Sequence, residues 1–306
     1  MLKRKLLFYN WSPSGRADFQ PAAAATRLEQ GIANSADFSI VDNNGVITAL
    51  EVISRGGGQE PTNFRMLALR GADDRPFKWD PTGSVGPIGL LDTEYPADVT
   101  HVSMWPDGIC AHDYGRDVPR ITRLSFFLRH KLSEHVSFEP IYKADMHQKL
   151  RDMTGQLRSV ELAVTKPEYA PRDRGAFANL FPAAFGEEAP SARITLGMGR
   201  YGPRTRYLDQ ATEEEVFALA ENAADLVTQM IIRGRSQRTG RVETVNLLSE
   251  HLQSESELRR SQAIPSMPDA AHAFFELDQA YKDFKSRDVF EKASQGRFVR
   301  GKKSID

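Results

Sequence analysis

The sequence predicts an α+β protein of two domains, with mixed or antiparallel sheets and covering helices. Short alternating strands are joined by tight-turn sequences such as Asp42 to Gly45 and Pro106 to Gly108, which favour antiparallel hairpins. Between the strands lie stretches with one apolar stripe at helical spacing. The chain of 306 residues is long enough for two domains. We predict an N-terminal α+β domain over 1–135 and a C-terminal α+β domain over 136–306, the latter with a long C-terminal helix and a basic tail.

The composition is ordinary for a soluble globular protein and carries no global charge bias. Hydrophobic residues make up 40%, charged residues 26%, and the net charge is −1. A nucleic-acid partner would therefore require positive charge gathered on one face. The single cysteine, Cys110, excludes an internal disulfide framework and is interpreted as an apolar filler on a strand. No apolar stretch of about 18 residues predicts a membrane span, and Leu6 to Tyr9 is too short for a signal peptide, so we expect a cytoplasmic protein.

The first part of the chain combines several strands with one helix. Pro21 suits the first turn of an alanine-rich helix that stops near Gly31. Gly56 to Gly58 precede no Lys-Ser/Thr pair and no helix, so they indicate a flexible link between strands and not a phosphate-binding loop. Pro76 to Pro96 is interpreted as a long surface connection. The expected strands cover residues 6–9, 38–41, 46–53 and 64–69, and the expected helix covers residues 20–32.

A hairpin is predicted around the turn Pro106 to Gly108, with strands over 100–105 and 109–114. A two-residue loop would place His101 opposite His112, where a metal ion could bind. A shift of one residue in the register, equally compatible with this turn, removes that pairing. Further ligands are not evident, so we predict no metal site.

The next helix, over 119–132, has two distinct stripes. Ile121, Leu124, Leu128 and Leu132 form the apolar one. The second is basic and is either a solvated face or a DNA contact; its arginines, with one just before the helix, are Arg116, Arg120 and Arg123.

The second half is predicted to be a denser α+β unit. Strands are expected over 136–143 and 157–165, separated by a polar connection over 144–156. The stretch 167–190, with its prolines, is interpreted as a covering segment or hinge. A strand over 193–199 has Arg193 outward, and candidate DNA contacts follow it at Arg200, Arg204 and Arg206.

The strongest candidate site is an arginine-rich loop. Thr212 and Glu215 form a capping-box pattern, which predicts a helix from Thr212 to Ile232. The loop follows that helix and precedes a strand over 242–248. It carries no acid, and planar guanidinium groups match phosphate bidentately. The alternative is a solvated, mobile connection. The candidate residues are Arg233, Arg235, Arg238 and Arg241.

The C-terminal part ends in a long helix and a basic tail. Asp269 is predicted to cap a helix whose stripe contains Phe274, Leu277 and Tyr281. The tail is either frayed and solvated or lies along a phosphate backbone, where Lys302 and Lys303 are candidate contacts.

These basic segments favour sequence-nonspecific binding of double-stranded DNA through its backbone, without a cofactor. Two alternatives remain open. A magnesium-dependent nuclease would need convergent carboxylates with a lysine, and the nearest candidates are Asp107, Glu139 and Lys143; the Glu-x-Lys spacing is missing because the last two are four apart. A protein–protein adaptor would leave the basic segments solvated.

Several segments occur in a recognisable order and spacing: 106–108, 114–115, 126–128, 138–141, 160–167, and 242–252 with Ser249, Glu250 and His251, followed by the helix end 282–286. From about Tyr95 to Ser286 the chain thereby resembles the Rex exclusion protein A family of lambdoid phages. The resemblance implies a cytoplasmic, homodimeric DNA-binding sensor of the abortive-infection type, encoded in a prophage and acting in anti-phage defence beside a membrane effector. The dimer is expected to form through apolar helix faces.

Overall fold

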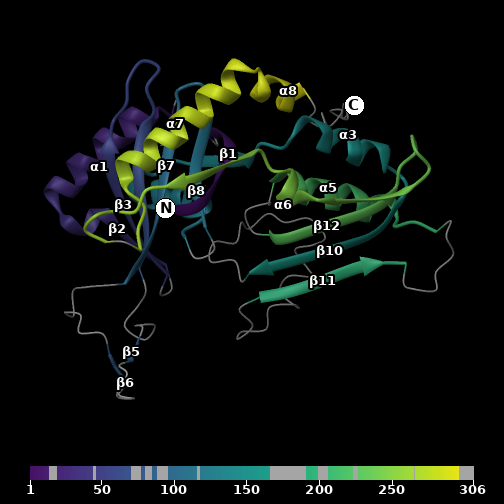
Figure 1. Ribbon diagram of the computed structural model, residues 1–306, viewed down its shortest axis with the longest axis horizontal. Coiled ribbons are helices and arrows are strands. Elements are labelled where there is room, and N and C mark those ends of the chain that lie inside the picture. The colour runs from purple at the N-terminus through teal and green to yellow at the C-terminus, as the bar shows by residue number, and fades with distance from the viewer. Residues whose placement is uncertain are drawn as a thin grey trace. The chain divides into compact units, whose positions relative to one another are not determined.

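A computed structural model describes residues 1–13, 19–43, 46–69, 77–79, 85–87, 96–115, 118–165, 191–198, 206–222, 227–264 and 266–295 (Figure 1). Its helices and antiparallel sheets confirm the α+β class. The chain forms two compact units. Unit 1 contains Met1–Phe138 and Gln253–Tyr281, and unit 2 contains Glu139–Leu252 and Lys282–Asp306. The division near residue 138 lies close to the predicted boundary at 135. The segment 253–281 differs from the prediction, because it packs with unit 1.

Unit 1 is built on a large antiparallel sheet. The strand order is β14-β1-β8-β7-β4-β3-β2, with β9 beside β1. The pairing of β14 with β1 explains why the segment after residue 252 returns to this unit. The strands are β1 (Leu2–Pro13), β2 (Ile40–Asn43), β3 (Val46–Ser54), β4 (Thr62–Leu69), β7 (Ala97–Met104), β8 (Ile109–Tyr114), β9 (Val136–Pro140) and β14 (Gln253–Leu258), and a separate pair is formed by β5 (Phe77–Trp79) and β6 (Val85–Pro87).

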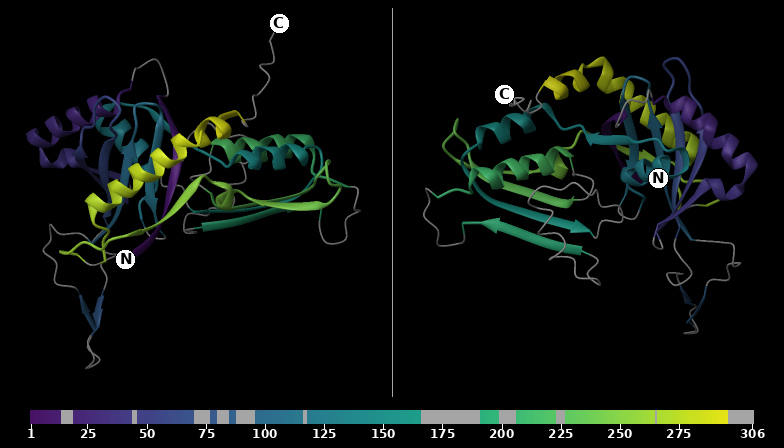
Figure 2. Two further views of the ribbon diagram at one scale, coloured as in Figure 1. Left: turned by 45° about the horizontal axis from the view of Figure 1, so that its top comes forward. Right: turned by 180° about the vertical axis from the view of Figure 1, so that it is seen from behind.

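Helices cover both faces of this sheet (Figure 2). On one face, α1 (Pro21–Asn34) and α2 (Ile121–Leu132) bury Leu28, Leu124 and Phe127 against strand residues of the main core, and the 3-10 turn η1 (Ala36–Ser39) follows α1. His101 points to the other face, because neighbours along a strand alternate, and its ring meets Phe274 of α7 (Ala270–Ser286) edge-on at 5.2 Å between centroids. The predicted stripe of this helix and its cap at Asp269 are confirmed, since Oδ1 of Asp269 accepts the His272 N–H at 2.9 Å.

Unit 2 contains a four-stranded antiparallel sheet in the order β11-β10-β12-β13. One face of the sheet forms a core with α3 and α5, in which Leu150, Val160 and Val216 are buried. Side chains of the opposite face, such as Glu161, Arg193 and Thr244, are exposed or half-buried. The elements are α3 (Ala144–Asp152), β10 (Leu157–Thr165), β11 (Ser191–Gly197), α5 (Gln210–Asn222), β12 (Val227–Arg235), β13 (Val242–Asn246), α6 (Leu247–Glu250) and α8 (Val289–Gln295).

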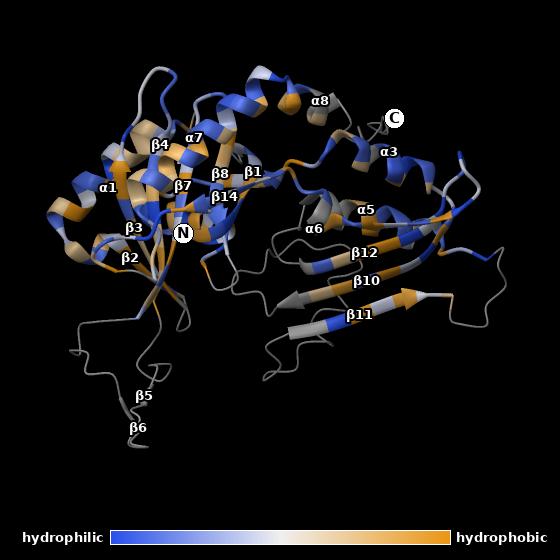
Figure 3. Ribbon diagram, viewed as in Figure 1, coloured by the Kyte–Doolittle hydropathy of each residue, from blue (hydrophilic) through white to orange (hydrophobic). Residues whose placement is uncertain are grey.

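The predicted helix from Thr212 to Ile232 is confirmed in its first part and wrong in its second. Helix α5 covers Gln210–Asn222, whereas Val227–Arg235 form strand β12. Met230 and Ile232 are buried while Arg233 is exposed, an alternation that matches strand periodicity once β12 pairs with β10. Tertiary pairing between two strands thus overrides an apparent helical stripe. Figure 3 shows β12 changing from hydrophobic to hydrophilic toward its C-terminal end.

The predicted capping box is also wrong. Asp209 caps α5, because its Oδ1 accepts the Thr212 N–H at 2.8 Å. This hydrogen bond stabilises the carboxylate and lowers the pKa of Asp209. The helix therefore begins a turn earlier than the sequence pattern indicated.

Several other boundaries differ from the sequence predictions. The polar connection expected over 144–156 contains helix α3, and strand β14 lies in a segment for which the sequence predicts no strand. The hairpin between β7 and β8 has the shifted register, with Val102 and not His101 opposite His112. Cys110 is fully buried on β8, as predicted. Most of 76–96 and all of 167–190 lie outside the described residues, and within the described helices none is long and apolar enough to cross a membrane.

Candidate functional site

The hairpin between β12 and β13 carries the arginines predicted to form the site, although Arg233 and Arg235 lie on the strand and not in a loop. Its turn is closed by two backbone hydrogen bonds, from Ser236 N–H to the Arg241 carbonyl at 2.9 Å and from Gly240 N–H to the Ser236 carbonyl at 2.8 Å. Gly240 has φ +67, a left-handed conformation that glycine adopts without strain. The turn is therefore an ordered structure and not an open connection.

A second turn, over Asp152 to Gln156 between α3 and β10, supports the hairpin. The Gln237 N–H donates to the Asp152 carbonyl at 2.6 Å, and Nε2 of Gln237 donates to the Thr154 carbonyl at 2.7 Å. Gly234 packs against the same turn so closely that an added Cβ would lie 2.9 Å from the Met153 side chain. Backbone contacts of this kind fix the hairpin to the end of α3.

Glu213 of α5 also contacts the supporting turn. Its two carboxylate oxygens accept the Gly155 N–H at 2.9 and 2.8 Å. Burial raises the pKa of Glu213, the Gly155 N–H opposes that shift, and the neighbouring charge of Glu214 adds to it. The carboxyl group thus links α5 to the turn on which the hairpin rests.

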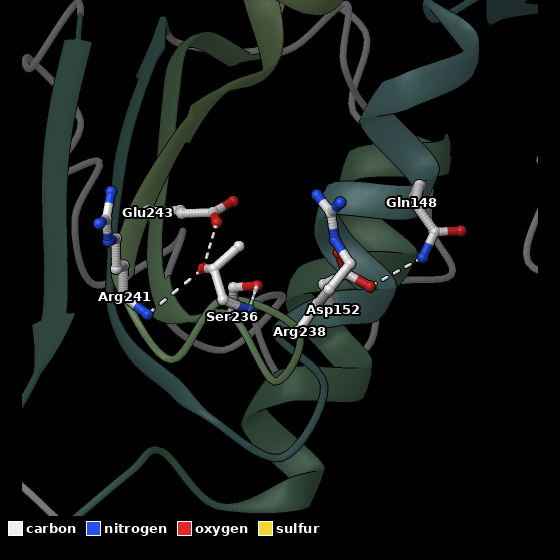
Figure 4. A network of polar contacts seen from close by, with 7 residues as sticks. Gln148, Asp152, Ser236, Arg238, Arg241 and Glu243 are labelled. Carbon is white, nitrogen blue, oxygen red and sulfur yellow. Dashed lines mark hydrogen bonds and ion pairs between the residues drawn. The ribbon is translucent and has the colours of Figure 1, made fainter.

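The arginines of the hairpin project in different directions. Arg233 and Arg235 are two residues apart on β12, so they extend from the same, open face of the sheet. Arg238 instead reaches toward the end of α3, where its Nε lies 3.2 Å from Oδ2 of Asp152 (Figure 4). Arg241, also exposed, extends away from that contact (Figure 4). Of the four arginines, only Arg233 and Arg235 thus share a face of the sheet.

Most of this positive charge lacks a carboxylate partner. Among the described residues, no acid forms an ion pair with Arg233, Arg235 or Arg241. Nε of Arg235 donates to the Gly240 carbonyl at 2.7 Å, which leaves its charge uncompensated. The exposed Arg206 adds to the same end of the sheet. It precedes Leu208, whose N–H donates to the carbonyl of Leu157, and Leu157 pairs with Gly234.

The remaining candidates do not belong to the described part of unit 2. Arg120 and Arg123 are half-buried at the start of α2 in unit 1, and each already interacts with a neighbouring group. Five other candidates lie outside the described residues: Arg116, Arg200, Arg204, Lys302 and Lys303.

Sequence reasoning missed the residues that hold the arginines in place. Asp152, Glu213 and Gln237 contact the two turns across long sequence separations, and no local pattern announces such pairs. The sequence does contain a signal for α3, since Met146 and Leu150 are apolar residues at i and i+4, and both are buried. Recognising that helix would have placed Asp152 at its end.

The residues considered for metal or nuclease chemistry are divided between the two units. Oδ2 of Asp107 accepts the Tyr281 hydroxyl at 2.6 Å in unit 1, whereas Glu139 and Lys143 belong to unit 2. Buried Asp113 accepts the Thr100 hydroxyl at 2.9 Å between two strands, a structural contact. The described residues contain no cluster of three potential metal ligands.

No protein-family model matches this chain, and no curated protein sequence matches it. The resemblance to the Rex exclusion protein A family stays a prediction. The function of the protein is therefore inferred from the arginines of the β12–β13 hairpin.

Proposed function

We propose that this protein binds double-stranded DNA through its phosphate backbone, using the β12–β13 hairpin and Arg206 of unit 2. The observation that carries the proposal is the set of exposed arginines at one end of a sheet that pair with no acid among the described residues: Arg206, Arg233, Arg235 and Arg241. A guanidinium group is permanently charged and presents a planar fork of donors that fits phosphate oxygens. An ordered hairpin presents these forks without the full cost of ordering a free loop.

The chemistry of the hairpin favours backbone contacts over base recognition. Residues 233–241 contain no aromatic side chain on which an unpaired base could stack. Phosphate contacts fix a protein on a duplex but carry no sequence information. We therefore expect similar affinities for duplexes of unrelated sequence.

The wider role remains part of the same proposal. A cytoplasmic, homodimeric DNA sensor in anti-phage defence, acting beside a membrane effector, is what the family resemblance implies. Backbone binding without sequence preference suits such a sensor, because infecting DNA cannot be recognised by one fixed sequence.

The proposal is tested by measuring dissociation constants for two duplexes of unrelated sequence, using fluorescence anisotropy. Arg235→Glu with Arg238→Glu should weaken binding to both duplexes by about 100-fold or more, since each lost charge-assisted contact costs roughly 1.5 kcal/mol. Salt in the buffer must be held constant because such contacts depend on it.

The matched control is Arg27→Glu with Arg55→Glu, which makes the same change in charge in unit 1. These arginines already pair with Glu134 and Glu29 at the surface. The control should bind both duplexes nearly as well as the wild type. Equal affinities for the wild type and the hairpin variant would contradict the proposal.

A further inference from the structure

Two arginines of the hairpin are held in the same chemical way. Nε of Arg235 donates to the Gly240 carbonyl at 2.7 Å, and Nε of Arg238 donates to Oδ2 of Asp152 at 3.2 Å. In each case the anchor uses the inner nitrogen of the guanidinium group. The two terminal nitrogens, which carry four of the five N–H donors, bond no protein group within the described residues.

Both anchors are themselves fixed. Asp152 is the last residue of α3, its side chain is only 12% exposed, and its other oxygen accepts Nε2 of Gln148 at 2.7 Å (Figure 4). The Gly240 carbonyl belongs to the closed turn described above. Arg238 is 73% exposed despite its contact, so its outer nitrogens face solvent. A fixed Nε restricts the rotation of a long side chain that would otherwise lose much entropy on binding.

From this geometry we propose that Arg235 and Arg238 are two separate preorganised contacts for backbone phosphodiesters, and that Asp152 is the positioning residue for Arg238. This inference rests on the proposed function and deepens it. Each guanidinium group offers its terminal nitrogens to the oxygens of a backbone phosphate, while Nε stays with its anchor.

The role of Asp152 can be distinguished from simple electrostatics by the sign of its effect. A carboxylate beside a phosphate site repels the ligand, so removing it should strengthen binding if charge alone decides. A positioning residue has the opposite effect, because its removal releases Arg238 from the binding geometry. The proposal therefore predicts that loss of a negative charge weakens binding of a polyanion.

The test compares Asp152→Ala with the matched control Glu243→Ala. Glu243 also belongs to the hairpin, but its carboxylate accepts the Thr239 hydroxyl at 2.9 Å and holds no arginine. With a duplex at constant salt, Asp152→Ala should bind about 5- to 10-fold more weakly, corresponding to roughly 1 kcal/mol of lost preorganisation. The control should bind equally well or more tightly.

A double-mutant cycle shows whether the effect passes through Arg238. In an Arg238→Ala background, Asp152→Ala should cause no further weakening. Affinity of Asp152→Ala that is unchanged or higher than that of the wild type would overturn the inference. A wild-type protein that does not bind DNA would instead overturn the proposed function itself, so the two failures are distinguishable.

A second variant keeps the inference testable if Asp152→Ala does not fold. Arg238→Lys retains the charge but loses the fork and its Nε anchor. It should bind about 10-fold more weakly than the wild type, as expected for loss of one charge-assisted hydrogen bond. Wild-type affinity for this variant would also overturn the inference.

Discussion

Arginines are held differently in the two units. In unit 1, Arg27, Arg55 and Arg65 each form an ion pair with a glutamate, and the Arg65 pair joins neighbouring strands β3 and β4. In the hairpin of unit 2, Arg235 is anchored by a backbone carbonyl, and only Arg238 contacts an acid. A carboxylate compensates the charge of its arginine partner, whereas an arginine anchored by a carbonyl keeps its full charge for a ligand. Arg238 is intermediate, because Asp152 contacts only its Nε and leaves the terminal nitrogens at the surface.

The difference extends across the sheet of unit 2. At the β10–β11 side of the open face, Arg193 lies 3.5 Å from Glu161. At the β12–β13 end, Arg233 and Arg241 have no such partner among the described residues. The protein therefore has a local excess of positive charge at the β12–β13 end of this sheet, although its net charge is −1. This excess depends on which arginines pair with acids and not on the overall composition.

The largest effect on folding should come from Gly234→Ala, which tests whether close packing of the hairpin backbone against the turn at Met153 and Gln156 stabilises the protein. A new Cβ would lie 2.9 Å from the Met153 side chain and 3.1 Å from the Gln156 carbonyl, so the hairpin must shift. Overpacking of this kind costs about 1–3 kcal/mol of unfolding free energy. Denaturant unfolding measures this decrease in the free energy of unfolding. An unfolding free energy equal to that of the wild type would contradict the prediction, because the supporting turn would then move aside without cost.

A smaller effect is expected from Glu213→Gln, which changes the carboxyl group that holds the supporting turn. Burial raises the folded-state pKa of Glu213 above its ordinary value of 4.5. Below 4.5 the group is protonated in both states, and as pH rises toward neutrality the unfolded state ionises first, so the folded state loses stability. Glutamine cannot ionise and escapes this loss.

The measurement is the difference in unfolding free energy between Glu213→Gln and the wild type as a function of pH. The difference should move in favour of the variant as pH rises through the window that begins near 4.5. Oε1 of glutamine can still accept the Gly155 N–H, so the weakened hydrogen bond contributes an offset that does not depend on this titration. A difference that is flat across pH, or that moves the other way, would contradict the assigned burial.

The sequence predicts those features of the fold that depend on local chemistry. Pro21 at the start of α1, Asp269 as the cap of α7 and the turn at Pro106 to Gly108 act through their own backbone or neighbouring residues. Features decided by distant partners were missed. Strand β14 depends on β1, and β12 was mistaken for helix because its pairing with β10 is invisible locally.

The candidate site also combines features that are visible locally in the sequence with features that depend on distant partners. The cluster of arginines over residues 233–241 is visible in the sequence itself, because a run of basic residues without an acid needs no structure to be recognised. Their anchors could not be predicted: Asp152 is 86 residues from Arg238, and the carbonyl of Gly240 carries no side-chain signal. Which arginines are paired and which are available is a property of the folded chain alone.

The most direct test of the central claim is the salt dependence of duplex binding. Release of counterions gives a slope of roughly −0.9 in log affinity against log salt for each phosphate contact. One contact from each of Arg206, Arg233, Arg235, Arg238 and Arg241 therefore predicts a slope of roughly −4.5 for the wild type. Replacing Arg233, Arg235 and Arg241 with alanine should reduce the magnitude of the slope by roughly 3. A wild-type slope near zero, or an identical slope for the triple variant, would contradict the account.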